Sequence, residues 1–188
     1  MFTDNLSCLI EQGSRFGCIY ADPPWQYQNQ GTRGSTNNHY RTMSVEEIAA
    51  LPIAQLAAEE SHLHLWATNA FLFDTQQIFD AWGFTFKSSF VWVKTQIGMG
   101  NYWRNAHEFL LLGVRGDLTA RNHDMGSWVQ APRTEHSEKP DRIRYMIERL
   151  SPGPYLELFG RHDVEGWTTF GNERHPYTPD LFLRTRNV

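Results

Sequence analysis

Four consecutive residues, Asp22-Pro23-Pro24-Trp25, have the types and spacing best suited to chemistry in this chain. They follow the apolar run 16–21, and because prolines cannot continue a sheet, the acid and the ring are predicted at a strand's carboxyl end. Asp22 and the Pro23 carbonyl could accept hydrogen bonds from the amino group of a planar base, while Trp25 stacks on its ring. That geometry suits attack of the amine on an electrophilic methyl group. The alternative is structural, with the prolines ending the strand and the tryptophan filling the core.

A lysine at a loop-to-helix junction is the second candidate. Lys139 precedes Pro140, which suits the first turn of a helix. A cation at a helix N-terminus opposes the helix dipole unless it faces an anion. Lys139 could therefore hold a carboxylate ligand together with nearby backbone N–H groups, or it could simply be solvated.

The third candidate is the segment 157–162, in which a buried strand ends in polar residues. Glu157 lies within the apolar run, and Gly160, Arg161 and His162 follow it. A strand end of this kind resembles a nucleoside-binding site, where Glu157 could bind a ribose or an amine. The alternative is a core strand followed by a surface Arg-His pair.

The elements that must position these candidates alternate between strands and helices, which predicts a single α/β sandwich with a mostly parallel sheet over residues 1–188. A capping box at 44–47 opens a helix that bends near Pro52 and resumes over 53–58, and Gly83 caps a helix over 70–82. A further helix covers 141–150. Strands are expected at 16–21, 62–67, 84–94, 107–114, 155–159 and 167–170, with long loops at 26–43, 95–105 and 115–138.

Composition limits the possible functions of the chain. The 188 residues carry a net charge of −4, so basic contacts to a nucleic acid would have to be local or come from a partner. The two cysteines have no metal or disulfide spacing. His62 and His64 share a strand face but lack a third ligand, so we interpret them as a surface face, and His107-Glu108 as structural; a metal-dependent hydrolase is the weakest alternative.

Taken together, the ordered motifs resemble the family of adenine N(6)-methyltransferases typified by the catalytic subunit of the eukaryotic messenger-RNA writer. The resemblance extends from about Phe16 to Glu173. It is carried by the segments 21–25, 40–44, 65–68, 92–95, 107–108, 112–116, 136–140, 146–153, 157–161 and 171–173.

The resemblance implies a Rossmann-like class I methyltransferase sandwich with a permuted motif order, in which the tetrapeptide precedes the main cofactor-binding strand. It implies S-adenosyl-L-methionine as methyl donor and no metal. The implied catalytic residues are Asp22, Pro23, Pro24 and Trp25, and the target base would contact Trp25 and Tyr40. The implied cofactor-binding residues are Asp22, Ser137, Lys139, Glu157, Phe159, Arg161, His162, Asn172 and Glu173.

The resemblance also implies a nucleic-acid substrate. The compact chain, which carries no zinc-finger module or target-recognition domain, looks like the bacterial and phage members, so DNA is expected rather than RNA. A homodimer is plausible because relatives pair, and the cytoplasm of a bacterial or phage-infected cell is expected, with no membrane association. The alternatives are the same reaction on RNA, or a catalytically silent nucleic-acid-binding subunit. The presence of both Asp22 and Trp25 argues against silence.

Overall fold

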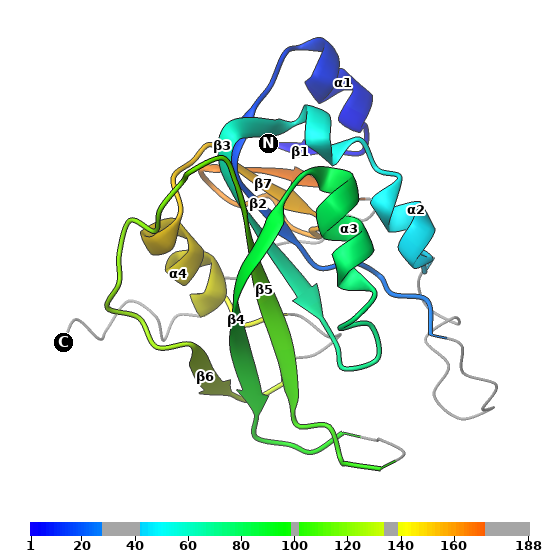
Figure 1. The fold of residues 1–188 in the computed structure, drawn as a ribbon, viewed down its shortest axis with the longest axis vertical. Coiled ribbons are helices and arrows are strands. Elements are labelled where there is room, and N and C mark those ends of the chain that lie inside the picture. Colours follow the sequence, from blue (N-terminus) through cyan, green and yellow to red (C-terminus); the bar gives the residue numbers. More distant parts are fainter. Residues whose placement is uncertain (28–41, 99–101, 134–138, 172–188) are drawn as a thin grey trace.

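Within the residues that the computed structural model describes, 1–27, 42–98, 102–133 and 139–171, eight strands form one sheet with helices on both faces (Figure 1). The strands are β1 (Phe2–Thr3), β2 (Phe16–Ala21), β3 (Ala57–Ala67), β4 (Thr85–Lys94), β5 (His107–Arg115), β6 (Trp128–Ala131), β7 (Tyr155–Leu158) and β8 (Trp167–Phe170). The helices are α1 (Leu6–Glu11), α2 (Val45–Ala49), the 3-10 helix η2 (Ile53–Gln55), α3 (Thr75–Trp82) and α4 (Arg142–Leu150).

The sheet has the order β1-β8-β7-β2-β3-β5-β4-β6. Only the β3–β5 and β4–β5 pairs among these described strands are antiparallel. The predicted α/β class with a mostly parallel sheet is therefore confirmed. The strand that precedes the tetrapeptide, β2, lies far before β7 in sequence and pairs with it in parallel.

The direction in which successive strands are added to the sheet reverses between β2 and β7. From β2 the chain continues to β3 on one side, whereas from β7 it continues to β8 on the other side. Ligands bind in open α/β sheets outside the carboxyl ends of the strands at such a switch point, because the connections diverge and leave a crevice. Ala21 pairs with Leu158 in register, so the residues after both strands emerge together at this edge.

The pleat of the sheet divides the core into two layers. Leu63 and Leu65 on β3 pack with buried residues of α1, α2 and α3 on one face. Trp66 on the same strand faces the opposite side and packs with Ile143 and Ile147 of α4. Side chains on the α4 face of β2 and β3 can therefore contact residues from the start of α4.

Two local signals are confirmed in detail. The Ser44 side chain accepts a hydrogen bond from the Glu47 N–H, and the Glu47 side chain accepts one from the Ser44 N–H, which completes the capping box of α2. Gly83 ends α3 in the left-handed region with φ of 76°. Among the described helices, none has the length and apolar character needed to cross a bilayer.

Three predicted boundaries are wrong. The helix expected over 70–82 begins only at Thr75, because residues before it form turns. The helix expected to resume over 53–58 is only η2, and Ala57 already belongs to β3 because it pairs with Phe16 on β2. The loop expected over 115–138 contains β6, which pairs with the distant end of β4.

Candidate active site at the carboxyl edge of the sheet

The tetrapeptide backbone is held by a compact set of hydrogen bonds directly after β2. The Trp25 N–H donates to the Pro23 carbonyl at 2.9 Å, which closes a tight turn around Pro24. The Met43 N–H donates to the Pro24 carbonyl at 2.8 Å, so residues 42–43 lie against the turn. The Pro23 carbonyl that was predicted to bind a base thus already accepts one bond, and its second lone pair can accept another.

Asp22 and Lys139 form an ion pair at the switch point. Lys139 Nζ lies 2.6 Å from Asp22 Oδ2, and the side chains are 10% and 36% exposed, respectively. Burial lowers the pKa of Lys139, but the carboxylates of Asp22 and Glu108 outweigh that effect and raise it. Lys139 therefore stays cationic, and two predicted site residues that lie 117 positions apart are brought into contact.

Glu108 extends this pair into a row of four alternating charges. Its Oε2 lies 3.4 Å from Lys139 Nζ, and its Oε1 bonds Lys94 Nζ. Burial raises the pKa of Glu108, but the two lysines outweigh burial and lower it. Sequence reasoning missed Glu108 and Lys94 as parts of the site, although both lie in segments that carry the family resemblance, 107–108 and 92–95.

Aromatic rings form the floor beneath the two lysines. Lys139 Nζ lies 5.3 Å from the ring centroid of Trp66, and Lys94 Nζ lies 4.8 Å from that of Trp92. Trp66 is fixed in turn, since its Nε1–H donates to the Tyr20 hydroxyl at 2.8 Å. Cation–π contacts of this kind compensate part of the lost hydration of a buried cation.

Trp25 occupies the core-filling position that the structural alternative describes. The residue is 6% exposed, and its ring stacks on Phe71 with centroids 4.8 Å apart. Tyr27 packs edge-on against the same Phe71 ring, and its hydroxyl lies 2.9 Å from Thr68 Oγ1. The stacking of Trp25 on a target base stays a prediction.

Glu157 is bound by an arginine that sequence reasoning missed. Arg144 Nη2 donates to Glu157 Oε1 at 2.7 Å and Arg144 Nε donates to Oε2 at 3.0 Å, which is a bidentate pair. Burial lowers the pKa of Arg144, but Glu157 outweighs burial and raises it. Glu157 is only 5% exposed, so the pair fixes the start of α4 against the end of β7, and its predicted contact with a ribose stays a prediction.

The turn after β7 has an unusual backbone. Phe159 adopts φ of 64°, in the left-handed region that non-glycine residues mostly avoid, and residues strained in this way cluster at functional sites. Gly160 follows it, and a Cβ there would lie 2.4 Å from Thr169 Cγ2, so only glycine fits. Arg161 and His162 come next and are half-buried. The other predicted site residues, Tyr40, Ser137, Asn172 and Glu173, lie outside the described residues.

The interpretation of His62 and His64 as a surface face is wrong. They are 1% and 4% exposed, because Ser151 at the end of α4 lies over them. His62 Nδ1 and His64 Nε2 each lie 2.8 Å from Ser151 Oγ, and His62 Nε2 lies 3.4 Å from the Leu118 carbonyl. Neutral imidazoles protonated at Nε2 satisfy all three contacts, since Ser151 then donates to His62 and accepts from His64.

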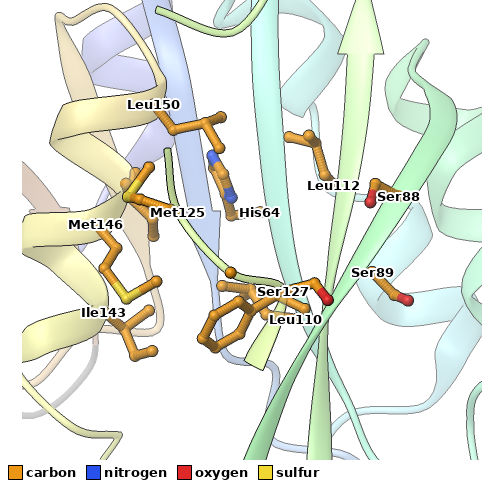
Figure 2. A pocket seen from close by; sticks show the side chains of 13 residues that line it. His64, Ser88, Ser89, Leu110, Leu112, Met125, Ser127, Ile143, Met146 and Leu150 are labelled. Carbon is orange, nitrogen blue, oxygen red and sulfur yellow. The ribbon is translucent and has the colours of Figure 1, made fainter. Parts of the chain in front are cut away.

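A pocket of about 150 Å³ lies between α4 and strands β4 and β5 (Figure 2). In this view Met125 and Met146 lie on the α4 side of it, Ser88 and Ser89 lie on the opposite side, and His64 lies between them. Among the residues that the structure describes, no predicted catalytic or cofactor-binding residue lines this pocket. The charged row at the sheet edge is therefore a separate place from the apolar pocket.

Comparison with known proteins finds sequences similar to most of this chain. A family model described as MT-A70 matches residues 16–173, a range that contains every residue of the charged row. The chain is 29% identical to the type II methyltransferase M.MunI of Mycoplasma sp, over 85% of this chain and 78% of that protein. It is 32% identical to the human N(6)-adenosine-methyltransferase catalytic subunit METTL3, over 90% of this chain and 30% of that protein.

A third similarity is to the human N(6)-adenine-specific methyltransferase METTL4, with 32% identity over 90% of this chain and 40% of that protein. The chain thus spans most of the length of M.MunI, but less than half of METTL3 and METTL4.

Proposed function

The chain belongs to the MT-A70 family, and from this membership we propose that it transfers a methyl group from S-adenosyl-L-methionine to the exocyclic 6-amino group of adenine in nucleic acid, most specifically in DNA. The observation that carries the proposal is the Asp22–Lys139 ion pair, with 2.6 Å between Nζ and Oδ2, at the switch point of the sheet. The names of METTL3 and METTL4 include N(6)-adenosine and N(6)-adenine methylation, which supports the same reaction for this chain.

The chemistry of the pair fits the amino-acid end of the donor. That end carries one carboxylate and one ammonium group, so Lys139 would bind the first while Asp22 binds the second. Separating a buried ion pair is costly unless each charge finds a new partner, and a zwitterion supplies both partners at once. Glu108 lies on β5 and contacts Lys139 at 3.4 Å. It would therefore keep Lys139 in place while Lys139 exchanges Asp22 for the donor carboxylate.

When bound, S-adenosyl-L-methionine supplies an electrophilic methyl group on sulfur. The chain supplies orientation: the carboxylate of Asp22 and the carbonyl of Pro23 would accept hydrogen bonds from the adenine amino group. These acceptors draw the nitrogen out of conjugation with its ring, and their fixed positions lower the reorganisation that the transition state requires. Phe159 has a left-handed backbone and Gly160 packs closely against Thr169 at the same edge, and this turn would lie beside the nucleoside part of the donor.

Methyl incorporation by two carboxylate variants tests the proposal. With labelled donor and adenine-containing oligonucleotides, Asp22→Asn should lower the rate by at least about 100-fold, the usual loss when one oriented polar group is removed from a transition state. Asp117→Asn is the matched control, because Asp117 is exposed beyond the far end of β5. Wild-type activity of Asp22→Asn would contradict the assignment.

We choose DNA because the chain is similar to the type II methyltransferase M.MunI over 78% of that protein's length. A base in a duplex must be flipped out or already unpaired before it can reach Asp22. Parallel reactions on DNA and RNA oligonucleotides of one sequence separate the two polymers. Calorimetry with S-adenosyl-L-methionine separates an enzyme from a silent subunit, which would bind no donor even when the oligonucleotide is present.

We further propose that the enzyme acts as a homodimer in the cytoplasm. A single acidic domain offers limited area to a polyanion, whereas specific protein–DNA interfaces bury roughly 1,000–2,500 Å² of protein surface. Light scattering of the purified protein, with and without oligonucleotide, measures the molar mass. A monomer under both conditions would contradict the dimer and leave the proposed reaction unaffected.

A further inference from the structure

Two large aromatic side chains are almost fully exposed where strands β4 and β5 connect. Tyr102 is 96% exposed and Trp103 is 87% exposed, the first and third most exposed large hydrophobic residues in the described chain. Burial of such rings is normally favourable, so an adjacent exposed pair is typical of a surface that contacts a ligand or a partner molecule. We call Tyr102 and Trp103 the aromatic tip.

The aromatic tip is connected directly to the charged row of the site. The Lys94 N–H donates to the Ala106 carbonyl at 2.7 Å, which closes the base of the connection beside Glu108. Trp103 is five residues from Glu108, so their Cα atoms are at most about 18 Å apart. Figure 1 shows the described parts of the connection, 95–98 and 102–106, beyond the edge of the sheet toward which β3 points. Strand β3 is parallel to β2, and Asp22 directly follows β2.

The surroundings of the aromatic tip favour an anionic ligand. The segments 95–107 and 125–133 contain no Asp or Glu, although the whole chain has a net charge of −4. They contain Arg104 and Arg133, both exposed. Attraction to a polyanion is therefore concentrated at this edge of an acidic chain.

Arg133 is held against the connection by a specific fit. The backbone N–H of Arg133 donates to Gln96 Oε1 at 3.1 Å. A Cβ at Gly98 would lie 2.6 Å from Arg133 Nη2, so the guanidinium occupies the space that a side chain at this position would fill. A cation is thereby placed on the connection that carries the two rings.

We propose that the aromatic tip stacks on an unpaired nucleotide of the substrate strand that flanks the target adenine, while Arg133 contacts a phosphate. This proposal rests on the proposed function and assigns the nucleic acid a second contact outside the base site. Successive nucleotides of a stacked strand rise by about 3.4 Å, so the span of at most about 18 Å between Trp103 and Glu108 corresponds to about five nucleotides. Trp and Tyr suit this role because every base has a stacking face.

The first test measures binding without catalysis. A fluorescently labelled single-stranded oligonucleotide with one adenine is titrated with each protein in the presence of S-adenosyl-L-homocysteine. Trp103→Ala should weaken binding by about fivefold to 150-fold, the range measured when one stacking ring is lost, and Trp103→Phe should restore most of the affinity. Tyr145→Ala is the matched control, because Tyr145 is a 60% exposed aromatic residue on α4.

The second test separates stacking from charge. Arg133→Gln should reduce the slope of log affinity against log salt by about 0.7, the value for one phosphate contact on a single strand, whereas Trp103→Ala should leave the slope unchanged. Unchanged affinity of Trp103→Ala would overturn the proposal. If the molar mass of that variant also falls, the rings would instead be assigned to contact with a protein partner. If the wild-type protein binds and methylates no oligonucleotide, the proposed function fails instead.

Discussion

The substitution Glu108→Gln removes the central anion of the charged row while keeping the shape of the side chain. In the native protein Lys94, Glu108, Lys139 and Asp22 sum to zero charge, whereas the variant carries one net positive charge. The two lysine side chains are only 10% exposed, so water cannot compensate fully for the loss.

The expected loss of unfolding free energy follows from these contacts. Removing one partner of a buried ion pair costs about 3–5 kcal/mol, and the lower end applies here because glutamine still accepts a hydrogen bond and Lys139 keeps Asp22. A loss of about 3 kcal/mol lowers the melting temperature of a chain of this length by about 6–12 °C. Urea unfolding followed by tryptophan fluorescence measures it, with Glu59→Gln on the exposed part of β3 as control.

A second substitution distinguishes lost charge balance from general damage. In Glu108→Gln combined with Lys94→Met, Lys139 and Asp22 again balance, so the double variant should be more stable than Glu108→Gln alone. A single variant within 0.5 kcal/mol of wild type would refute the reasoning, and so would a double variant that is no more stable than the single one.

The same row predicts the response to acid. The pKa of Glu108 is lowered in the folded state, so its ionised form contributes stability above the unfolded value near 4.5, and this contribution is lost as pH falls through the lowered pKa. Glu108→Gln should therefore show a shallower loss of stability than wild type below about pH 4.5. A parallel dependence of both proteins in that range would contradict the assignment.

Two further predictions concern the donor and the buried histidines. S-adenosyl-L-methionine at 100 times its dissociation constant should add about 2.7 kcal/mol to wild-type stability, measurable as a thermal shift, and Lys139→Met should abolish that shift. Burial lowers the pKa of His64 to about 3, with neighbouring His62 acting in the same direction. Because the unfolded chain binds a proton below about pH 6.5 and the folded chain does not, stability should fall by about 1.4 kcal/mol per pH unit from 6.5 to 4.5, and His64→Gln should flatten that slope in urea titrations. An unflattened slope would mean that other groups dominate this window.

Local signals in the sequence were sufficient for the elements that act within a few residues. The apolar run before Asp22, the capping box at Ser44 and the helix-ending Gly83 each depend on neighbours close in sequence, and each was predicted correctly. Elements that depend on distant partners were not. The four residues of β6 form a strand only because the end of β4 lies beside them, and β3 begins early because β2 pairs with it.

The same distinction applies to the site. Asp22 and Lys139 could be proposed separately because each conflicts with its local surroundings: an acid beside two prolines and a cation at a helix start. Glu108 and Arg144 show no such conflict. Their roles arise only when the β4–β5 register brings Glu108 beside the lysines, and when α4 places Arg144 over Glu157.

The Asp22–Lys139 pair has a consequence for turnover. In the proposed complex the pair contacts the carboxylate and the ammonium group of the donor. It does not contact the sulfur atom, where the donor and the demethylated product differ. We therefore expect S-adenosyl-L-homocysteine to remain bound through the same two contacts and to compete with fresh donor. An analogue without its carboxylate would leave Lys139 without a ligand anion and bind far more weakly. The pair thus selects the class of molecule, and departure of the demethylated product becomes a step that can limit the rate.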